Sequence, residues 1–355
     1  MGFHSAIQEA VQRIQANRKE QQGAWKRLGF LREKNLQELG KEFLESAFAT
    51  PVQSIPSEGK IAGTDSGFEK QELHALDLTL IRAGAVCFEY EKNALKRCTY
   101  WPSSFTYPEP FLGSRALERE ESEKSVSVQR LLKEVEACKE IIERDSPRFA
   151  FLDGSLVPQF QDKPNGKSEL NFSYETLVFA FQQLYETAEK NKCQLVGCVE
   201  DSRGNRIKQM LEESLHENLN GLNDIALLEG LLHKGERSFV FSYTKSPQEH
   251  AIVKDFSSTW QESLHAFYLR PSLYDVPLRV EFVSKNPLKD VQRVAETVYA
   301  QSSAHQEYAF PAVLIEADLR AKLRPEEVRL VNDQVFDQIG RNVVVFKRRD
   351  RRPFA

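Results

Sequence analysis

The sequence predicts a mixed α/β fold in which helices flank a sheet of antiparallel and parallel strands. Three strand-like runs, at 60–68, 75–90 and 94–101, follow one another with no room for helices between them, which indicates an antiparallel meander. Later strand-like runs are separated by a helical pattern at 173–191, and a strand–helix–strand order requires a parallel crossover. The 355 residues, 41% hydrophobic and 28% charged, can bury a sizeable core.

An N-terminal helical arm is predicted over residues 1–50, with the helix itself at 4–48. Ile7 and Ile14 belong to a series of apolar residues at helical spacing. Two prolines and a glycine then mark a linker. We therefore expect residues 61–355 to form a separate domain.

The domain begins with the three antiparallel strands and continues with alternating helices and strands. These are a charged helix at 116–144, a strand at 148–155, the helix at 173–191 and a strand at 194–201. Their order is that of the ribonuclease H-like fold. Further elements are predicted as C-terminal helical additions and strands: strands at 238–245 and 277–283, a helix at 287–302, a last pair of helices and a final strand at 342–355.

Composition excludes several classes of protein. No apolar run is long enough to span a bilayer and the N-terminus lacks a secretory signal, so we expect a cytoplasmic protein without membrane contact. The five cysteines do not suggest a disulfide framework, and the one close pair, Cys193 and Cys198, has no partner pair for zinc. The net charge of -4 does not decide about nucleic acid, because local clustering matters more.

Two short motifs resemble catalytic signatures but lack an essential residue. A phosphate-binding loop needs a glycine five residues before the glycine of "GKS" at 166–168, and position 161 is glutamine. The segment "FLDGSLV" resembles that of phosphatases with an aspartate nucleophile, but Phe151 stands where that aspartate is needed. The seven histidines show neither metal-ligand spacing nor a nucleophile elbow.

Two carboxylates follow apolar strands in a similar way. Asp65 is placed at the end of the first strand in "IAGTDSGF", and Asp153 at the end of the fourth in "FAFLDGS". In the predicted topology these strands are neighbours, so the carboxylates can lie side by side and would repel each other unless a cation neutralised them. Magnesium or manganese suits such an oxygen site and can activate water for phosphodiester hydrolysis. Alternatively, both aspartates are ordinary turn residues.

The chain resembles the NurA nucleases, manganese-dependent enzymes that process DNA ends. The resemblance is carried, in order, by "GTDSGF", "FLDGSLVP", "LVGCVEDSR", "SYTKS", "LRVEFV" and "FPAVLIEADLRAKL". It implies a ribonuclease H-like core, a homodimer, Mn²⁺ as the cofactor with Mg²⁺ as the alternative, and association with the hexameric HerA translocase ATPase.

The resemblance also implies a set of metal ligands. The first two fall on Asp65 and Asp153, and a glutamate on the preceding helix is the third. Within the family's Arg-x-x-x-Glu pattern, Arg130 and Glu134 match, and Glu136 is the alternative.

The fourth ligand lies in a segment where this chain departs from the family pattern. Archaeal members carry Tyr-Pro-x-x-Leu-x-x-Ala-His, whereas this chain has Phe310, Pro311, Leu314, Ala317 and Asp318. The tyrosine is lost and the histidine has become Asp318, on a helix that Pro311 is placed to start. Asp318 can complete an all-carboxylate site or belong to a solvated helix face.

Basic residues near the expected site are candidates for DNA binding, because such clusters can follow a phosphate backbone. They are Arg203, Arg206, Lys208, Lys245 and Arg279, to which the C-terminal tail adds Lys347, Arg348, Arg349, Arg351 and Arg352.

The sequence therefore favours a metal-dependent deoxyribonuclease acting on single-stranded DNA or DNA ends. The resemblance implies 5'–3' exonuclease and single-strand endonuclease activity in DNA end resection and recombinational repair. The alternative is a non-catalytic adaptor subunit of a DNA-motor ATPase, which the changes at Phe310 and Asp318 leave open.

Overall fold

The computed structural model describes residues 3–73, 76–114, 118–166 and 168–339. The chain forms two compact units, each built from separate stretches of sequence. Unit 1 comprises Met1–Pro56, Cys198–Pro247 and Gln261–Pro311, and unit 2 comprises Ser57–Gly197, Gln248–Trp260 and the chain after Pro311. The expected helical arm thus shares unit 1 with much later parts of the chain.

Unit 2 is built on a mixed sheet. Its strands are β2 (Gly59–Glu72), β3 (Leu76–Glu91), β4 (Ala94–Trp101), β5 (Glu109–Ser114), β6 (Phe149–Asp153) and β7 (Gln194–Val199, whose end belongs to unit 1). They lie in the order β7–β6–β2–β3–β4, and β5 pairs with β3. Strands β2, β3 and β4 form an antiparallel meander, and β6 runs parallel to β2. The predicted neighbouring positions of the first and fourth strands are confirmed.

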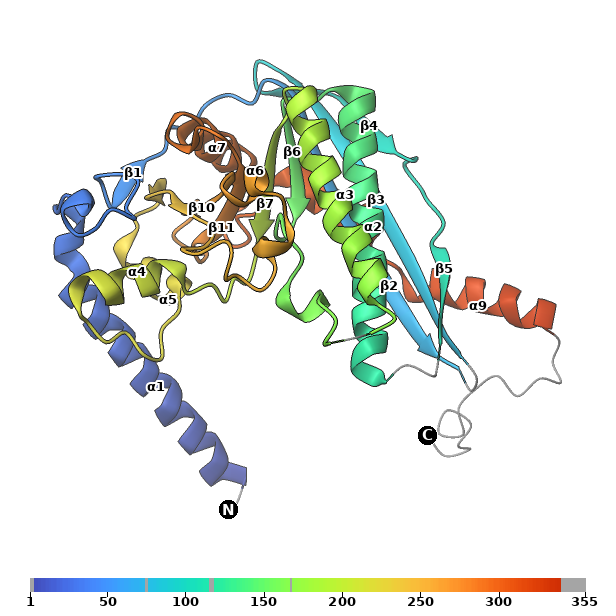
Figure 1. Ribbon diagram of the computed structural model, residues 1–355, viewed down its shortest axis with the longest axis horizontal. Helices are drawn as coiled ribbons and strands as arrows, with labels where there is room; N and C mark the ends of the chain where they lie inside the picture. The colour runs from blue at the N-terminus through green and yellow to red at the C-terminus, as the bar shows by residue number, and fades with distance from the viewer. Residues whose placement is uncertain (1–2, 74–75, 115–117, 167, 340–355) are drawn as a thin grey trace. The chain divides into compact units, whose positions relative to one another are not determined.

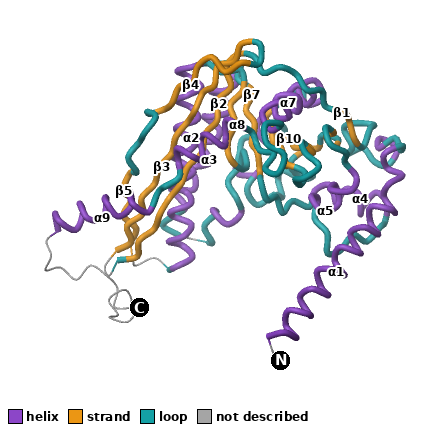
Figure 2. Tube along the Cα trace, turned by 180° about the vertical axis from the view of Figure 1, so that it is seen from behind, coloured by secondary structure: helices purple, strands orange, loops and turns teal. Residues whose placement is uncertain are grey.

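Helices cover this sheet. They are α2 (Arg119–Asp145), η3 (Phe160–Asp162), α3 (Asn171–Lys190), η4 (Val253–Asp255), α6 (Ser258–Gln261), α8 (Ala312–Ala321) and α9 (Pro325–Ile339). The long helices α2 and α3 lie side by side on the sheet (Figure 1), and the view from behind shows α8 beside β2 (Figure 2). The order meander, α2, β6, α3, β7 confirms the predicted mixed α/β fold.

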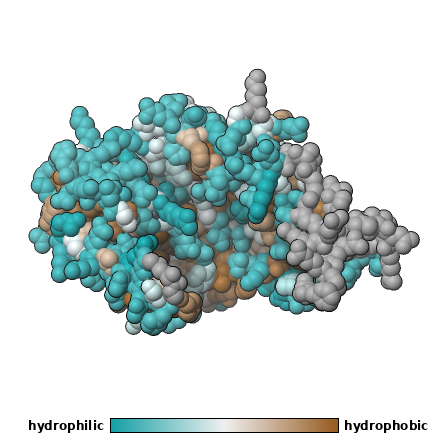
Figure 3. Space-filling model, turned by 90° about the horizontal axis from the view of Figure 1, so that it is seen from below, coloured by the Kyte–Doolittle hydropathy of each residue, from teal (hydrophilic) through white to brown (hydrophobic). Residues whose placement is uncertain are grey.

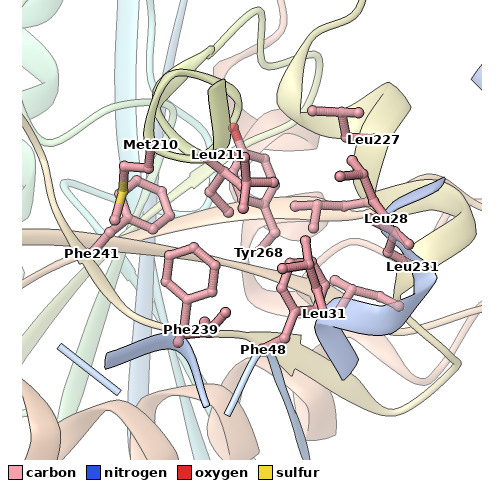
Figure 4. Packing of buried hydrophobic residues seen from close by; sticks show 14 of the residues in the cluster. Leu28, Leu31, Phe48, Met210, Leu211, Leu227, Leu231, Phe239, Phe241 and Tyr268 are labelled. Atoms are coloured by element: carbon pink, nitrogen blue, oxygen red, sulfur yellow. The ribbon is translucent and has the colours of Figure 1, made fainter. Parts of the chain in front are cut away.

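Unit 1 has its own strands, helices and core. Its elements are α1 (Phe3–Leu28), η1 (Gly29–Arg32), η2 (Leu36–Glu38), β1 (Ala49–Pro51), α4 (Arg206–Leu215), α5 (Asp224–Leu231), β8 (Glu236–Ser238), β9 (Phe241–Ser242), β10 (Leu264–Arg270), β11 (Leu278–Val283) and α7 (Pro287–Ser302). The strands lie in the order β1–β8–β10–β11, with β9 beside β10. Leu28, Leu31, Met210, Phe239 and Tyr268 belong to a buried cluster that joins the arm to the later segments (Figure 4).

The arm departs from the predicted continuous helix. Helix α1 ends at Leu28, and two short 3-10 turns follow. Asn35 caps the second turn by accepting a hydrogen bond from the backbone N–H of Gln37, and such local bonds compete with a helix. The apolar residues that continued the pattern, Leu31 and Leu36 among them, are fully buried from this irregular segment.

Other differences concern strands. In the run at 238–245 only Ser238, the last residue of β8, and the two residues of β9 are in strands, and β10 was not predicted. The final strand predicted at 342–355 and the basic tail lie outside the described residues.

None of the described helices is long and apolar enough to cross a membrane. The surface seen in Figure 3 is mostly hydrophilic, with smaller hydrophobic areas.

Candidate functional site

Strands β2 and β6 bring Asp65 and Asp153 to adjacent positions. Their parallel pairing ends with Thr64 opposite Leu152, so the two aspartates are the next residues along each strand. Asp153 ends β6 as predicted. The prediction that Asp65 ends its strand is wrong, because β2 continues to Glu72 in pairing with β3. Asp65 marks the end of the pairing with β6, not the end of β2.

Helix α8 approaches β2 closely on the face that Asp65 shares. Side chains two residues apart point to the same face of a strand, so Gly63 and Gly67 flank Asp65 on this face. A Cβ added at Gly63 would lie 2.8 Å from the carbonyl oxygen of Val313, and one added at Gly67 would lie 2.7 Å from that of Ala321. The two glycines therefore leave the room in which α8, the helix that carries Asp318, lies on the strand.

Helix α2 supplies Glu134 from a fixed position. The Glu134 side chain is only 2% exposed and its carboxylate accepts hydrogen bonds from the Ser66 hydroxyl and, at 2.9 Å, from Arg130 Nη1. Arg130 also donates to the Ser66 hydroxyl at 2.8 Å. The alternative, Glu136, is exposed and pairs with Lys133. The structure thus places Glu134, and not Glu136, against the strand that carries Asp65.

Three other carboxylates act on the ionisation of Asp65. Burial, followed by the charges of Glu134, Asp153 and Asp318, raises the pKa of Asp65 to about 8, against a hydrogen bond from the backbone N–H of Ser66. Burial also raises the pKa of Glu134, although Arg130 and Ser66 oppose this. Asp65 is itself only 8% exposed. A buried carboxylate among three others is a group that a cation would stabilise.

The carboxylates do not converge on one point. Over the described parts of the chain, no three His, Cys, Asp or Glu side chains are arranged so that they could hold a metal ion as they stand. Asp318 is exposed, and the Glu134 carboxylate is held by Ser66 and Arg130. Ion binding therefore requires the exposed Asp318 side chain to turn toward Asp65. The oxygen-only donor set suits Mn²⁺ or Mg²⁺.

The candidate DNA-binding residues that come before the C-terminal tail lie in unit 1 and differ in their surroundings. Arg203 is exposed. Arg206 pairs with Glu42 at 2.8 Å, and Lys245 pairs with Glu213. Arg279 is 7% exposed, bonds Glu281 at 2.8 Å and lies over the rings of Phe241, Tyr243 and Tyr268. Its burial favours a structural role.

Sequence reasoning missed the residues that support the carboxylates. Ser66 contacts both Arg130 and Glu134, and Gly63 and Gly67 admit α8. The available signal was the alternation of small residues in "GTDSG", which leaves one face of the strand without side chains on either side of Asp65.

Carboxylates beside the central strands of a mixed sheet are the side chains expected in a nuclease that uses a divalent ion. Within that class the chain belongs to the NurA domain family, whose model matches residues 59–323. No curated protein sequence matches the chain.

Solved structures agree in fold. The NurA nuclease from Sulfolobus solfataricus has a TM-score of 0.58 at 14% identity, over 97% of this chain and 99% of that one. A structure of NurA with manganese has a TM-score of 0.52 at 10% identity, over 95% of this chain and 98% of that one. A further NurA structure has a TM-score of 0.52 at 10% identity, over 94% and 98%. At such low identity these similarities concern the fold.

Proposed function

We propose that this NurA-family nuclease holds Mn²⁺, or Mg²⁺ as the alternative, between Asp65, Glu134, Asp153 and Asp318 and hydrolyses phosphodiester bonds of DNA. The observation that carries the proposal is the buried Asp65 carboxylate, whose pKa is raised to about 8 by burial and by the other three residues. The manganese in a solved NurA structure supports the choice of ion.

Each of the four residues would have its own role in holding the ion. A divalent ion supplies charge neutralisation for the phosphate undergoing hydrolysis. Asp65 and Asp153 supply ligands from the two central strands, and Asp318 can approach them from α8 because Gly63 and Gly67 leave room. Glu134 is held by Arg130 and Ser66, which orients its carboxylate before an ion arrives.

Activity assays with conservative variants test this assignment. Wild type, Asp153→Asn, Glu134→Gln and Glu136→Gln are compared for cleavage of an end-labelled oligonucleotide with and without Mn²⁺. We expect the first two variants to lose activity by roughly 100-fold or more. Glu136→Gln is the matched control, because Glu136 is exposed on the same helix, and it should retain activity.

Calorimetric titration with Mn²⁺ separates the proposal from the adaptor alternative. Full activity of a folded Asp153→Asn protein would contradict the assignment of the site. Absence of both Mn²⁺ binding and cleavage in the wild type, together with binding to a motor ATPase, would favour a non-catalytic adaptor.

The proposed substrate is single-stranded DNA or DNA ends, cut as a 5'–3' exonuclease and as an endonuclease during end resection in recombinational repair. The proposed partners are a second copy of the chain and a HerA-type hexameric translocase. Family membership supports these assignments. The first half of α1 supports the proposal of protein partners, because Phe3, Ile7, Val11 and Ile14 form an apolar stripe that is exposed by 84%, 44%, 45% and 67%.

A charge placed on this stripe tests the partners. Ile14→Glu should weaken dimerisation in sedimentation analysis, or binding to a HerA-type ATPase in co-elution. Gln12→Glu, an exposed position on the other side of the helix, should change neither. Equal behaviour of the two variants in both measurements would remove α1 as a docking surface.

A further inference from the structure

Two exposed aromatic side chains lie in the segment between β4 and β5 in unit 2. Phe105 is 55% exposed and Tyr107 is 70% exposed. Their rings contact each other edge to face, with centroids 5.2 Å apart and an interplanar angle of 86°. Paired aromatic rings left in water are unfavourable unless something binds them. Neither ring belongs to the carboxylate site.

The segment is fastened to the rest of unit 2. The Arg82 guanidinium lies over the Phe105 ring, 5.6 Å from its centroid. Arg320 donates a hydrogen bond to the carbonyl oxygen of Ser104 at 3.4 Å, and the Ser103 hydroxyl donates to that of Phe105. The aromatic pair is therefore presented on an anchored segment, which lowers the entropy lost when a ligand binds.

Arg82 lies over one ring of the pair, and a stretch of chain with two further cationic residues lies next to Arg82. Arg82 is paired with Glu327 but also donates to the carbonyl oxygen of Lys322 at 3.1 Å, so the stretch after α8 lies beside Phe105. Lys322 and Arg324 on this stretch are both exposed. Exposed aromatic rings with cations close by are typical of surfaces that bind single-stranded nucleic acid, where bases stack on the rings and cations follow the backbone.

Arg320, which holds the segment through Ser104, also connects the aromatic pair to the proposed metal site. Arg320 belongs to α8, two residues after Asp318. Residues two apart in a helix point to nearly opposite sides, so the two side chains are separated by about the width of a helix, about 10–12 Å. A base stacked on the pair would belong to the same strand as a phosphate held near Asp318.

We propose that Phe105 and Tyr107 form a stacking platform for bases of single-stranded DNA that the carboxylate site cuts. The inference rests on the proposed function, since it names a subsite for the same substrate. It assigns single-strand preference to ring stacking, because bases in a duplex present no free face to a ring.

Binding measured without cleavage tests the platform. Full-length protein in EDTA is titrated into a fluorescein-labelled oligothymidylate and into a blunt duplex, with fluorescence anisotropy as the readout. Phe105→Ala and Tyr107→Ala should each weaken single-strand binding roughly tenfold, and duplex binding should not change. Phe105→Tyr and Tyr107→Phe keep a ring at each position and should bind almost as wild type does. Phe172→Ala is the matched control, because Phe172 on α3 is 78% exposed.

The outcomes separate this inference from the proposed function. Unchanged single-strand affinity in the Phe105→Ala/Tyr107→Ala double variant would overturn the platform, as would an equal loss in Phe172→Ala or loss of a protein partner with DNA binding intact. The platform variants should keep wild-type Mn²⁺ affinity in calorimetry. If the wild type binds single strands through these rings but neither binds Mn²⁺ nor cleaves, the proposed function fails and the binding site stands.

Discussion

Asp65 is a buried carboxylate whose ionisation is opposed by its surroundings, and this predicts how stability depends on pH. Its pKa rises from 3.8 to about 8 on folding. Between these values the folded protein holds a proton on Asp65 that the unfolded chain has released, so the free energy of unfolding falls as pH rises through this window. We expect the melting temperature of the metal-free protein to decrease from pH 5 to about pH 8.

The control for this prediction is Asp65→Asn, which cannot ionise and should flatten the decrease. Mn²⁺ competes with the proton, so its stabilising effect should be larger at pH 8 than at pH 6. Differential scanning fluorimetry at several pH values, with and without Mn²⁺, measures both effects. A variant with the same pH slope as wild type would show that Asp65 is not the titrating group.

Ser66 is predicted to position Glu134. Its hydroxyl donates to the Glu134 carboxylate and accepts from Arg130, and groups that orient metal ligands typically contribute 10–100-fold to metal affinity. We expect Ser66→Ala to weaken Mn²⁺ binding by about that factor in calorimetry, with Ser66→Thr partly restoring it. Ser122 is also a buried serine, but it lies on α2. Ser122→Ala should leave the Mn²⁺ affinity unchanged. Equal affinities of Ser66→Ala and wild type would show that Arg130 alone orients Glu134.

The sequence could predict a site residue only where the residues next to it in the chain point to its role. Asp153 follows a buried apolar strand directly, and charge at such a position requires an explanation. The side-chain contacts of Ser66 depend on where α2 lies, which periodicity within one helix does not determine. Likewise, Arg279 carries a positive charge, as DNA-binding residues do. Only the structure shows that it is buried against Glu281 and three aromatic rings.

At the scale of elements, the close contact between α8 and β2 predicts the effect of a single methyl group. A Cβ at Gly63 would lie 2.8 Å from the carbonyl oxygen and 2.9 Å from the carbonyl carbon of Val313. These are backbone atoms of α8, which cannot move aside by a change of rotamer as a side chain can. We expect Gly63→Ala to displace α8, reduce the free energy of unfolding by about 1–3 kcal/mol and weaken Mn²⁺ binding by moving Asp318.

Gly29→Ala is the matched control, because a Cβ at Gly29 meets no atom within 4 Å. Urea unfolding and Mn²⁺ calorimetry on both variants measure the two effects. If Gly63→Ala behaves as Gly29→Ala does, α8 is not held against β2 by the absence of a side chain.

Elements with a long, regular pattern could be predicted, and short ones could not. Helix α7 begins and ends where its apolar spacing predicts, at Pro287 and Ser302. The arm after Leu28 is apolar at helical spacing, yet Asn35 caps a short 3-10 turn and the irregular segment buries the same residues. Strand β10, at Leu264–Arg270, lacks the alternation of a half-exposed strand because six of its seven residues are buried.

On the scale of the whole molecule, the division into two units could not be predicted from the order of elements. The sequence places a linker between the arm and the rest, and a change of unit does occur between Pro56 and Ser57. However, the arm contributes to a core with residues such as Met210 and Tyr268. Contacts across such sequence separations leave no local pattern, because each segment contributes only a few apolar side chains.

This division predicts that stability and metal binding can be changed independently. Leu31 is fully buried in the core of unit 1, whereas all four proposed ligands lie in unit 2. Leu31→Ala should reduce the free energy of unfolding by about 2–5 kcal/mol in a urea titration, while Mn²⁺ affinity in the folded protein stays within about twofold of wild type, as for independent sites. Asp153→Asn should show the reverse, with binding lost and the unit 1 core intact. A large loss of Mn²⁺ affinity in folded Leu31→Ala would mean that the core of unit 1 determines the geometry of the carboxylates.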